Sequence, residues 1–171
     1  MSVPDIRLLL PCQLFEGLTR EELDRLMEIC EWKSFTKANT LFREGEPSNQ
    51  LYVVVEGLLG VRKHIIDQKE DRLPLLPVIA ELGTGEIVGE FSFFDGTPRS
   101  AEVFAIADTW TLVLTPEAFQ QFSNRFPQIA QKITVNLVKI LISRIRKSNE
   151  KLSIALEWGW EVHGFAKPSV G

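Results

Sequence analysis

The sequence predicts a mainly β domain with helices at both ends, and three observations carry this prediction. Between Glu31 and Ala105, short runs of aromatic and β-branched residues alternate with glycines, a pattern typical of strands joined by tight turns. A helix-capping pattern precedes this region near Thr19, and a long helical pattern follows it to about Trp158. Many short strands with this spacing indicate a sandwich or a barrel.

Composition sets the broad class of protein. The chain has 171 residues, of which 44% are hydrophobic and 25% charged, the size and balance of one globular domain. The net charge of −4 leaves no basic excess to neutralise phosphates, so we expect no direct nucleic-acid partner. No apolar run reaches the ~18 residues of a membrane span. Because Cys12 and Cys30 lack the spacing of a metal site or a disulfide framework, we expect a cytoplasmic protein without a metal or cofactor.

The first helix is expected over about residues 20–30. Thr19 can cap its start while Glu22 reaches back to the capping residue. Residues 64–77 have no clean period and are expected to form a long hairpin loop or an irregular insertion. The strands are expected at Trp32–Phe35, Leu41–Phe42, Leu51–Val55, Leu58–Val61, Val78–Leu82, Ile87–Val88, Val103–Ile106 and Thr109–Leu114.

Two helices are expected after the last strand. Thr115 caps a short helix that begins at Pro116 and runs to about Asn124. The second helix spans about residues 127–158. Its seam positions alternate by four and three, which predicts partial burial against a second copy of the chain. These positions are 134, 138, 141, 145, 148 and 152.

The chain is expected to end in an irregular tail. Residues 1–158 form the predicted domain, and residues 159–171 are rich in glycine, proline and serine at their end. Trp158 and Trp160 lie at the start of this tail, and we expect their side chains to pack into a groove.

Residues 88–105 carry the chemistry. Gly89 and Glu90 follow a predicted strand and lead into one short helical turn, whose free amides can hold an anion. Arg99 supplies a planar fork of donors that suits phosphate oxygens, whereas a carboxylate accepts from hydroxyls. A hydroxyl and a phosphate in one small pocket indicate a ribose phosphate.

This segment resembles the phosphate-binding cassette of cyclic nucleotide-binding domains, the family that includes catabolite activator proteins and the regulatory subunit of cyclic AMP-dependent protein kinase. The resemblance covers about residues 12–152 and implies a β-roll, a double-stranded β-helix similar to a jelly roll, with an N-terminal helix and a long C-terminal helix. The residues of the cassette that match are Gly89, Glu90, Gly96, Thr97, Pro98, Arg99, Ala101, Val103 and Ala105.

The resemblance also implies a role for individual residues. Glu90, helped by the backbone of Gly89, would accept from the ribose 2′-hydroxyl, and Arg99 would pair with the cyclic phosphate. The Ser92 amide and Ser100 would complete the phosphate cradle. The expected ligand-binding residues are Gly89, Glu90, Phe91, Ser92, Arg99, Ser100 and Ala101. Cyclic AMP is the preferred ligand, while Ser100 leaves cyclic GMP open; Ser148 and Asn149 would lie near the base.

The function implied is a cyclic nucleotide sensor that is not an enzyme. Phosphate capture would pull the cassette inward, and the following helices would rearrange and act on an unknown downstream protein. Residues 153–171 are too few for a DNA-binding unit of ~60 residues. The alternative is a ligand-free adaptor, in which the β-roll and the tail with Trp158 and Trp160 dock a protein partner. In a pocket that has lost its ligand, Glu90 and Arg99 would form an ion pair with each other.

Two further sets of side chains are expected to have structural roles only. The aromatic side chains of the short helix should be hydrophobic plugs, and the basic end of the last helix should be a solvated face favoured by the helix dipole. The first set is Phe91, Phe93 and Phe94, and the second is Arg144, Arg146, Lys147 and Lys151.

Overall fold

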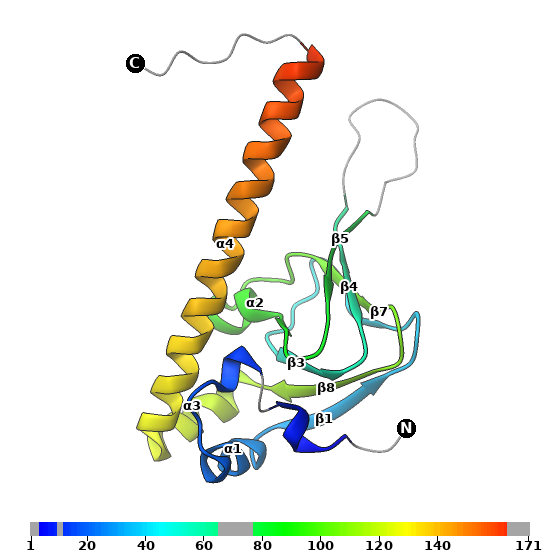
Figure 1. Ribbon diagram of the computed structural model, residues 1–171. Helices are drawn as coiled ribbons and strands as arrows, with labels where there is room; N and C mark the ends of the chain where they lie inside the picture. The colour runs from blue at the N-terminus through cyan, green and yellow to red at the C-terminus, as the bar shows by residue number, and fades with distance from the viewer. Residues whose placement is uncertain (1–3, 10–11, 65–76, 164–171) are drawn as a thin grey trace, which may run out of the picture.

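The computed structural model describes residues 4–9, 12–64 and 77–163, and it consists of two four-stranded antiparallel sheets flanked by helices (Figure 1). One sheet has the strand order β1-β8-β3-β6 and the other β2-β7-β4-β5. The strands are β1 (Glu31–Phe35), β2 (Thr40–Phe42), β3 (Leu51–Glu56), β4 (Leu59–Arg62), β5 (Val78–Leu82), β6 (Ile87–Val88), β7 (Glu102–Ala105) and β8 (Thr109–Leu114). The expected β-roll and all eight strand positions are therefore confirmed.

Strand β3 explains how the two layers are held together. Its side chains point alternately to opposite faces of the sheet. Tyr52 and Val54 belong to the core between the two sheets, whereas Val53 and Val55 belong to a second core that the helices cover. Because both faces of β3 are buried, the strand is a continuous apolar run with no polar alternation.

The N-terminal helices cover the outer face of the first sheet. They are two 3-10 turns, η1 (Ile6–Leu9) and η2 (Gln13–Phe15), followed by α1 (Arg20–Met27). Thr19 and Glu22 form the predicted capping box. Helix α1 ends three residues before the expected limit.

The C-terminal helices pack on the same face and then leave it. Helix α3 (Pro116–Arg125) begins at the predicted cap, Thr115, which accepts from the Ala118 amide. Helix α4 (Pro127–His163) extends well past α1 and α3 (Figure 1). Its first turns are tied to the N-terminal segment by Asn136, which donates to the carbonyls of Leu14 and Glu16 at 3.1 and 2.8 Å.

The expected tail begins later than predicted. Helix α4 continues to His163, so residues 159–163 are helical because the propensity of this segment outweighs its single glycine. Residues 164–171 and most of the expected 64–77 loop lie outside the described residues. The Trp158 side chain is 70% exposed in the single chain instead of lying in a groove. Within the described ranges, none of the helices combines the length and apolarity that a membrane crossing requires.

Candidate functional site

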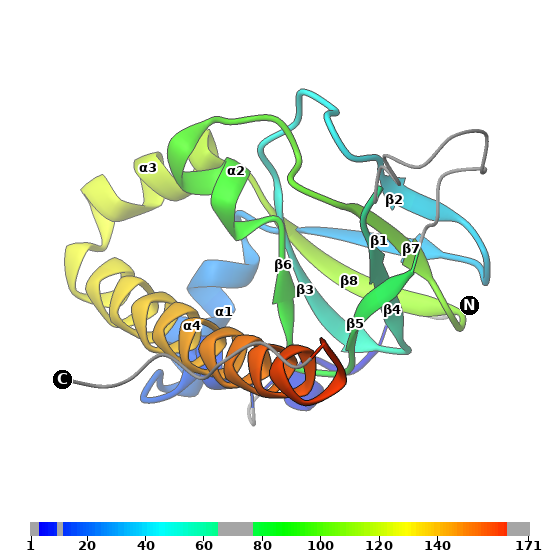
Figure 2. The same cartoon turned by 90° about the horizontal axis from the view of Figure 1, so that it is seen from above.

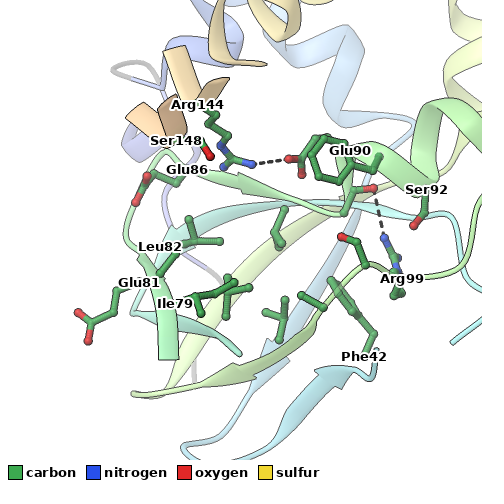
Figure 3. A pocket seen from close by; sticks show the side chains of 18 of the residues that line it. Phe42, Ile79, Glu81, Leu82, Glu86, Glu90, Ser92, Arg99, Arg144 and Ser148 are labelled. Atoms are coloured by element: carbon green, nitrogen blue, oxygen red, sulfur yellow. Dashed lines mark hydrogen bonds and ion pairs between the residues drawn. The ribbon is translucent and has the colours of Figure 1, made fainter. Parts of the chain in front are cut away.

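A cavity of about 610 Å³ lies between the second sheet, the short helix α2 (Glu90–Asp95) and α4. Figure 2 shows α4 running along one side of the roll, with α2 beside it. The floor is apolar and comes from the strands, through residues such as Phe42, Val61, Leu82 and Val103. Polar side chains enter from α2, from the loop before β7 and from α4 (Figure 3). All seven of the predicted ligand-binding residues line this cavity.

Helix α2 is the predicted short helical turn, and a glycine bounds it on each side. Gly89 and Gly96 have φ values of +87° and +68°, in the left-handed region that favours glycine. A Cβ at Gly89 would lie 2.3 Å from an Arg99 nitrogen and 2.5 Å from the Gln50 carbonyl oxygen. Gly89 therefore allows the start of α2 to approach the arginine closely, whereas a Cβ at Gly96 would meet no atom within 4 Å.

Arg99 is the most deeply buried cation of the site, with 2% of its surface exposed. It lies in the loop just before β7, and its Nε, Nη1 and Nη2 atoms donate to Ser48 Oγ, the Gly89 carbonyl and the Gln50 carbonyl. The guanidinium also stacks over the Phe42 ring at 4.0 Å, a cation–π contact. Burial lowers the pKa of Arg99 from its ordinary value.

The partners of Arg99 are all electrically neutral. None of the described carboxylates forms an ion pair with it. A buried charge without a counter-charge is unfavourable by several kcal/mol. The arrangement is therefore suited to receive an anion from outside the chain.

Glu90 pairs with α4 instead of with Arg99. Its carboxylate, 5% exposed, accepts from Arg144 Nη1 at 2.5 Å (Figure 3), and Arg144 Nη2 donates to the Ile87 carbonyl. The expectation that Arg144 is merely solvated is wrong, because α4 passes over the start of α2. Nor do the described contacts contain the Glu90–Arg99 ion pair expected in a pocket that has lost its ligand.

The aromatic residues of α2 divide between core and surface. Phe93 is buried and packs against Phe119 with ring centroids 5.9 Å apart. Phe91 and Phe94 are 55% and 52% exposed, so the prediction that they are plugs is wrong. A six-residue helix packed on one side buries only one of the three positions.

The open end of the cavity carries charges of both signs. Ser148 lines it as expected, whereas Asn149 is not among the described lining residues. Sequence reasoning missed the other polar side chains here because they come from elements distant in sequence. They are Glu81 and Glu86 from the β5–β6 region and Arg144, Lys147 and Lys151 from α4; Glu81 points away from the cavity in Figure 3.

Neither cysteine belongs to this site. Burial raises the pKa of Cys12 to about 11 and that of Cys30 to about 12, so both are held as thiols. Across residues 4–9, 12–64 and 77–163, no three His, Cys, Asp or Glu side chains gather as a metal site would require.

Known proteins resemble this chain in both sequence and fold. It is 30% identical over 142 residues to the Cyclic AMP receptor protein of Thermus thermophilus, a match covering 82% of this chain and 61% of that protein. It is 25% identical to the crystal structure of a cyclic nucleotide-binding domain from Methylobacillus flagellatus, with a TM-score of 0.74 over 96% of this chain and 84% of that one. The chain spans about three fifths of the length of the first curated relatives.

Some relatives are enzymes, but the similarity covers a small part of them. Glutaminase 1 of Bradyrhizobium diazoefficiens is 28% identical over 141 residues, which are 82% of this chain and 21% of the enzyme. The Cyclic nucleotide-binding domain family model matches residues 32–126, which include α2, Arg99 and both sheets. The chain therefore belongs to the cyclic nucleotide-binding domain family.

Proposed function

We propose that this chain is a regulatory module that binds a cyclic nucleotide and is not itself an enzyme. One observation carries the proposal: Arg99 is buried beside a cavity and has only neutral partners. An anionic phosphate would supply the missing counter-charge through charge-assisted hydrogen bonds. The Ser92 amide and Ser100 would contact the same phosphate, and Glu90 would accept from the ribose 2′-hydroxyl.

Cyclic AMP is the proposed ligand. The relative from Thermus thermophilus is named a cyclic AMP receptor protein, and the apolar floor of the cavity suits a flat purine. Cyclic GMP is the alternative, since the hydroxyl of Ser100 can bond to either nucleotide.

The ion pair between Glu90 and Arg144 supports a route from ligand to helix. Any shift of Glu90 toward a ribose hydroxyl changes its bond to Arg144, which α4 carries. A ligand shifts such an equilibrium only by its different affinities for the two arrangements. We therefore propose that binding changes the packing of α4, and through it an unidentified protein partner.

The exposed face of α4 supports a homodimer. Its apolar side chains repeat at alternating intervals of three and four residues, the heptad spacing of a two-stranded coiled coil. The expected seam included Thr134, Leu141 and Ser148. At each of these three positions the exposed stripe contains the next residue in the sequence instead, and one of these, Asn149, is polar. The stripe is Val135, Val138, Ile142, Ile145, Asn149, Leu152 and Leu156.

Sedimentation equilibrium of the wild type and of Ile145→Glu tests the dimer. Ile145 is 61% exposed, so the substitution costs the single chain little stability. A dimeric wild type and a monomeric variant support the proposal. A wild type that is still monomeric at about 100 times the Kd of a micromolar dimer would contradict the proposal.

The adaptor alternative is less well supported. In a pocket that has lost its ligand we expect Glu90 to pair with Arg99, and Glu90 pairs with Arg144 instead. A cavity of about 610 Å³ beside both groups is a size usual for a small-molecule site.

Equilibrium dialysis with labelled cyclic AMP tests the binding proposal. We expect Arg99→Lys to bind at least tenfold more weakly than the wild type, because lysine offers a point charge in place of the planar fork. Arg25→Lys is the matched control, since Arg25 is an exposed arginine stacked on Phe126 and away from the cavity. Equal affinity of the wild type and Arg99→Lys would refute the proposed role of Arg99.

A further inference from the structure

We propose that Ser48 is a positioning residue of the phosphate site. It accepts a hydrogen bond from Arg99 Nε at 2.7 Å and so fixes the direction in which the guanidinium presents its remaining donors. The inference rests on the proposed function, because it concerns how the same arginine meets a nucleotide phosphate.

The hydrogen bonds of Arg99 leave a defined edge free. An arginine has five N–H donors in a rigid fork, one on Nε and two on each terminal nitrogen. Nε is held by Ser48, Nη1 donates to the Gly89 carbonyl at 3.2 Å and Nη2 to the Gln50 carbonyl at 2.8 Å. Each terminal nitrogen therefore keeps one N–H for a ligand.

Ser48 adds a third hydrogen bond that restrains rotation of the fork, beside the two that the terminal nitrogens make to backbone carbonyls. The Phe42 ring lies under the guanidinium at 4.0 Å, a contact that holds the guanidinium in place without a directional bond to any of its N–H groups. Ser48 is the one side chain of the described residues that hydrogen-bonds to Arg99, and the Gly89 and Gln50 contacts are to backbone carbonyls. The Ser48 hydroxyl is bonded to Nε, where the guanidinium joins the side chain, and so restrains the direction in which the two terminal nitrogens point.

The serine also leaves the charge of Arg99 uncompensated. A hydroxyl accepts a hydrogen bond without a negative charge, whereas a carboxylate at this place would neutralise the guanidinium and compete with a phosphate. Ser48 therefore orients the Arg99 guanidinium without neutralising its positive charge.

The loop that holds Ser48 is joined to Arg99 along the backbone as well. The Arg99 amide donates to the Glu46 carbonyl at 3.0 Å, and the Gly45 amide donates to the Arg99 carbonyl at 2.8 Å. The Ser48 amide also donates to the Glu46 carbonyl at 3.0 Å. Ser48 and Arg99 therefore share one framework, and the distance between them does not depend on α4 or on the open end of the cavity.

The Gln50 contact is fixed by its own neighbours. The Gln50 side-chain oxygen accepts from the Tyr52 hydroxyl at 2.9 Å and from Lys33 Nζ at 3.3 Å. These two bonds hold Gln50 in place, and the Gln50 carbonyl accepts from Arg99 Nη2. With Ser48 removed, Arg99 keeps its two backbone partners but loses the restraint on Nε, so we expect a guanidinium that stays in the site and is less firmly directed.

The test measures the affinity of Ser48→Ala for cyclic AMP and for its two phosphorothioate diastereomers, in which sulfur replaces one or the other exocyclic oxygen. Loss of one hydrogen bond to a charged group predicts binding of cyclic AMP about tenfold weaker. The ratio of the affinities for the two diastereomers should move toward one, because it depends on the direction of the donors. Ser48→Thr keeps the hydroxyl and should restore both values.

Ser123→Ala is the matched control. It removes a serine hydroxyl that bonds to the Phe119 carbonyl at 2.7 Å within α3, away from the cavity, and should change neither affinity nor ratio. General destabilisation by Ser48→Ala would weaken both diastereomers alike, and an unchanged ratio would overturn the proposal.

A second measurement is made on the wild type and so does not depend on whether Ser48→Ala folds. It follows the NMR resonance of the Arg99 Nε–H. Assigned by its absence in Arg99→Lys, it should be sharp and slow to exchange before ligand is added; rapid exchange would overturn the inference. A wild type that binds no cyclic nucleotide refutes the proposed function and this inference with it. A wild type that binds, with Ser48→Ala equal to it, refutes only the role of Ser48.

Discussion

The ion pair between Glu90 and Arg144 joins the start of α2 to the middle of α4, and Arg144→Gln breaks it. Glu90 is 5% exposed and Arg144 31% exposed, with 2.5 Å between Oε1 and Nη1. The substitution leaves a buried carboxylate without its cation and also removes the bond to the Ile87 carbonyl. We expect a clear loss of stability from one surface-facing change.

The magnitude lies between two limits. Removing one partner of a fully buried pair costs about 3–5 kcal/mol, and an exposed pair contributes about 0–1 kcal/mol. Because water reaches Arg144 but hardly reaches Glu90, we expect Arg144→Gln to lower the free energy of unfolding by about 2 kcal/mol. In a domain of this size that corresponds to a fall in melting temperature of roughly 4–8 °C.

Urea denaturation followed by tryptophan fluorescence measures this change. Lys147→Ala is the control, because Lys147 is exposed on the same helix and forms no ion pair among the described residues. The double variant Glu90→Gln/Arg144→Gln should be less destabilised than the sum of its single variants. A free energy for Arg144→Gln within about 0.5 kcal/mol of the wild type, or additive effects in the cycle, would refute this account of the pair.

Two other predictions concern the cavity rim and the outer face of the second sheet. Gly89→Ala should destabilise the fold by more than Gly96→Ala in thermal unfolding, since both meet a positive φ but only Gly89 would bring a Cβ against Arg99 and Gln50; equal effects would contradict the close approach. Glu102 accepts from Arg62 at 2.6 Å, which holds the pKa of its carboxyl below the ordinary value, so its contribution is present above about pH 4.5 and is lost as pH falls through the lowered pKa. Unfolding free energies measured between pH 6 and 3 should therefore fall less steeply in Glu102→Gln, and an unchanged slope would contradict the prediction.

Much of the fold could be predicted because local sequence patterns agree with it. The short apolar runs predicted all eight strands, and the structure contains the expected helix caps at Thr19 and Thr115. The end of α4 could not be predicted, since Gly159 is tolerated inside a helix at a cost of only about 1 kcal/mol. Its exposed stripe could not be placed either, because which apolar residues face the roll depends on how the helix packs.

The candidate site could be predicted where it follows one continuous motif. Residues 89–101 bring Glu90, Ser92 and Arg99 to one cavity. Arg144 and Ser48 could not be found this way, because they lie 54 and 51 positions from their partners and belong to no local pattern. Only the tertiary packing of α4 and of the loop before β3 brings them to the site.

The measurement that tests the central claim most directly is a calorimetric titration of the wild type with cyclic AMP and then cyclic GMP. The protein is first unfolded and refolded to remove any carried-over nucleotide. The account predicts saturable binding with one nucleotide per chain, at micromolar or tighter affinity, or about −8 kcal/mol, and with cyclic AMP the tighter of the two. A folded protein that releases no heat and shows no binding by dialysis with either nucleotide would contradict it.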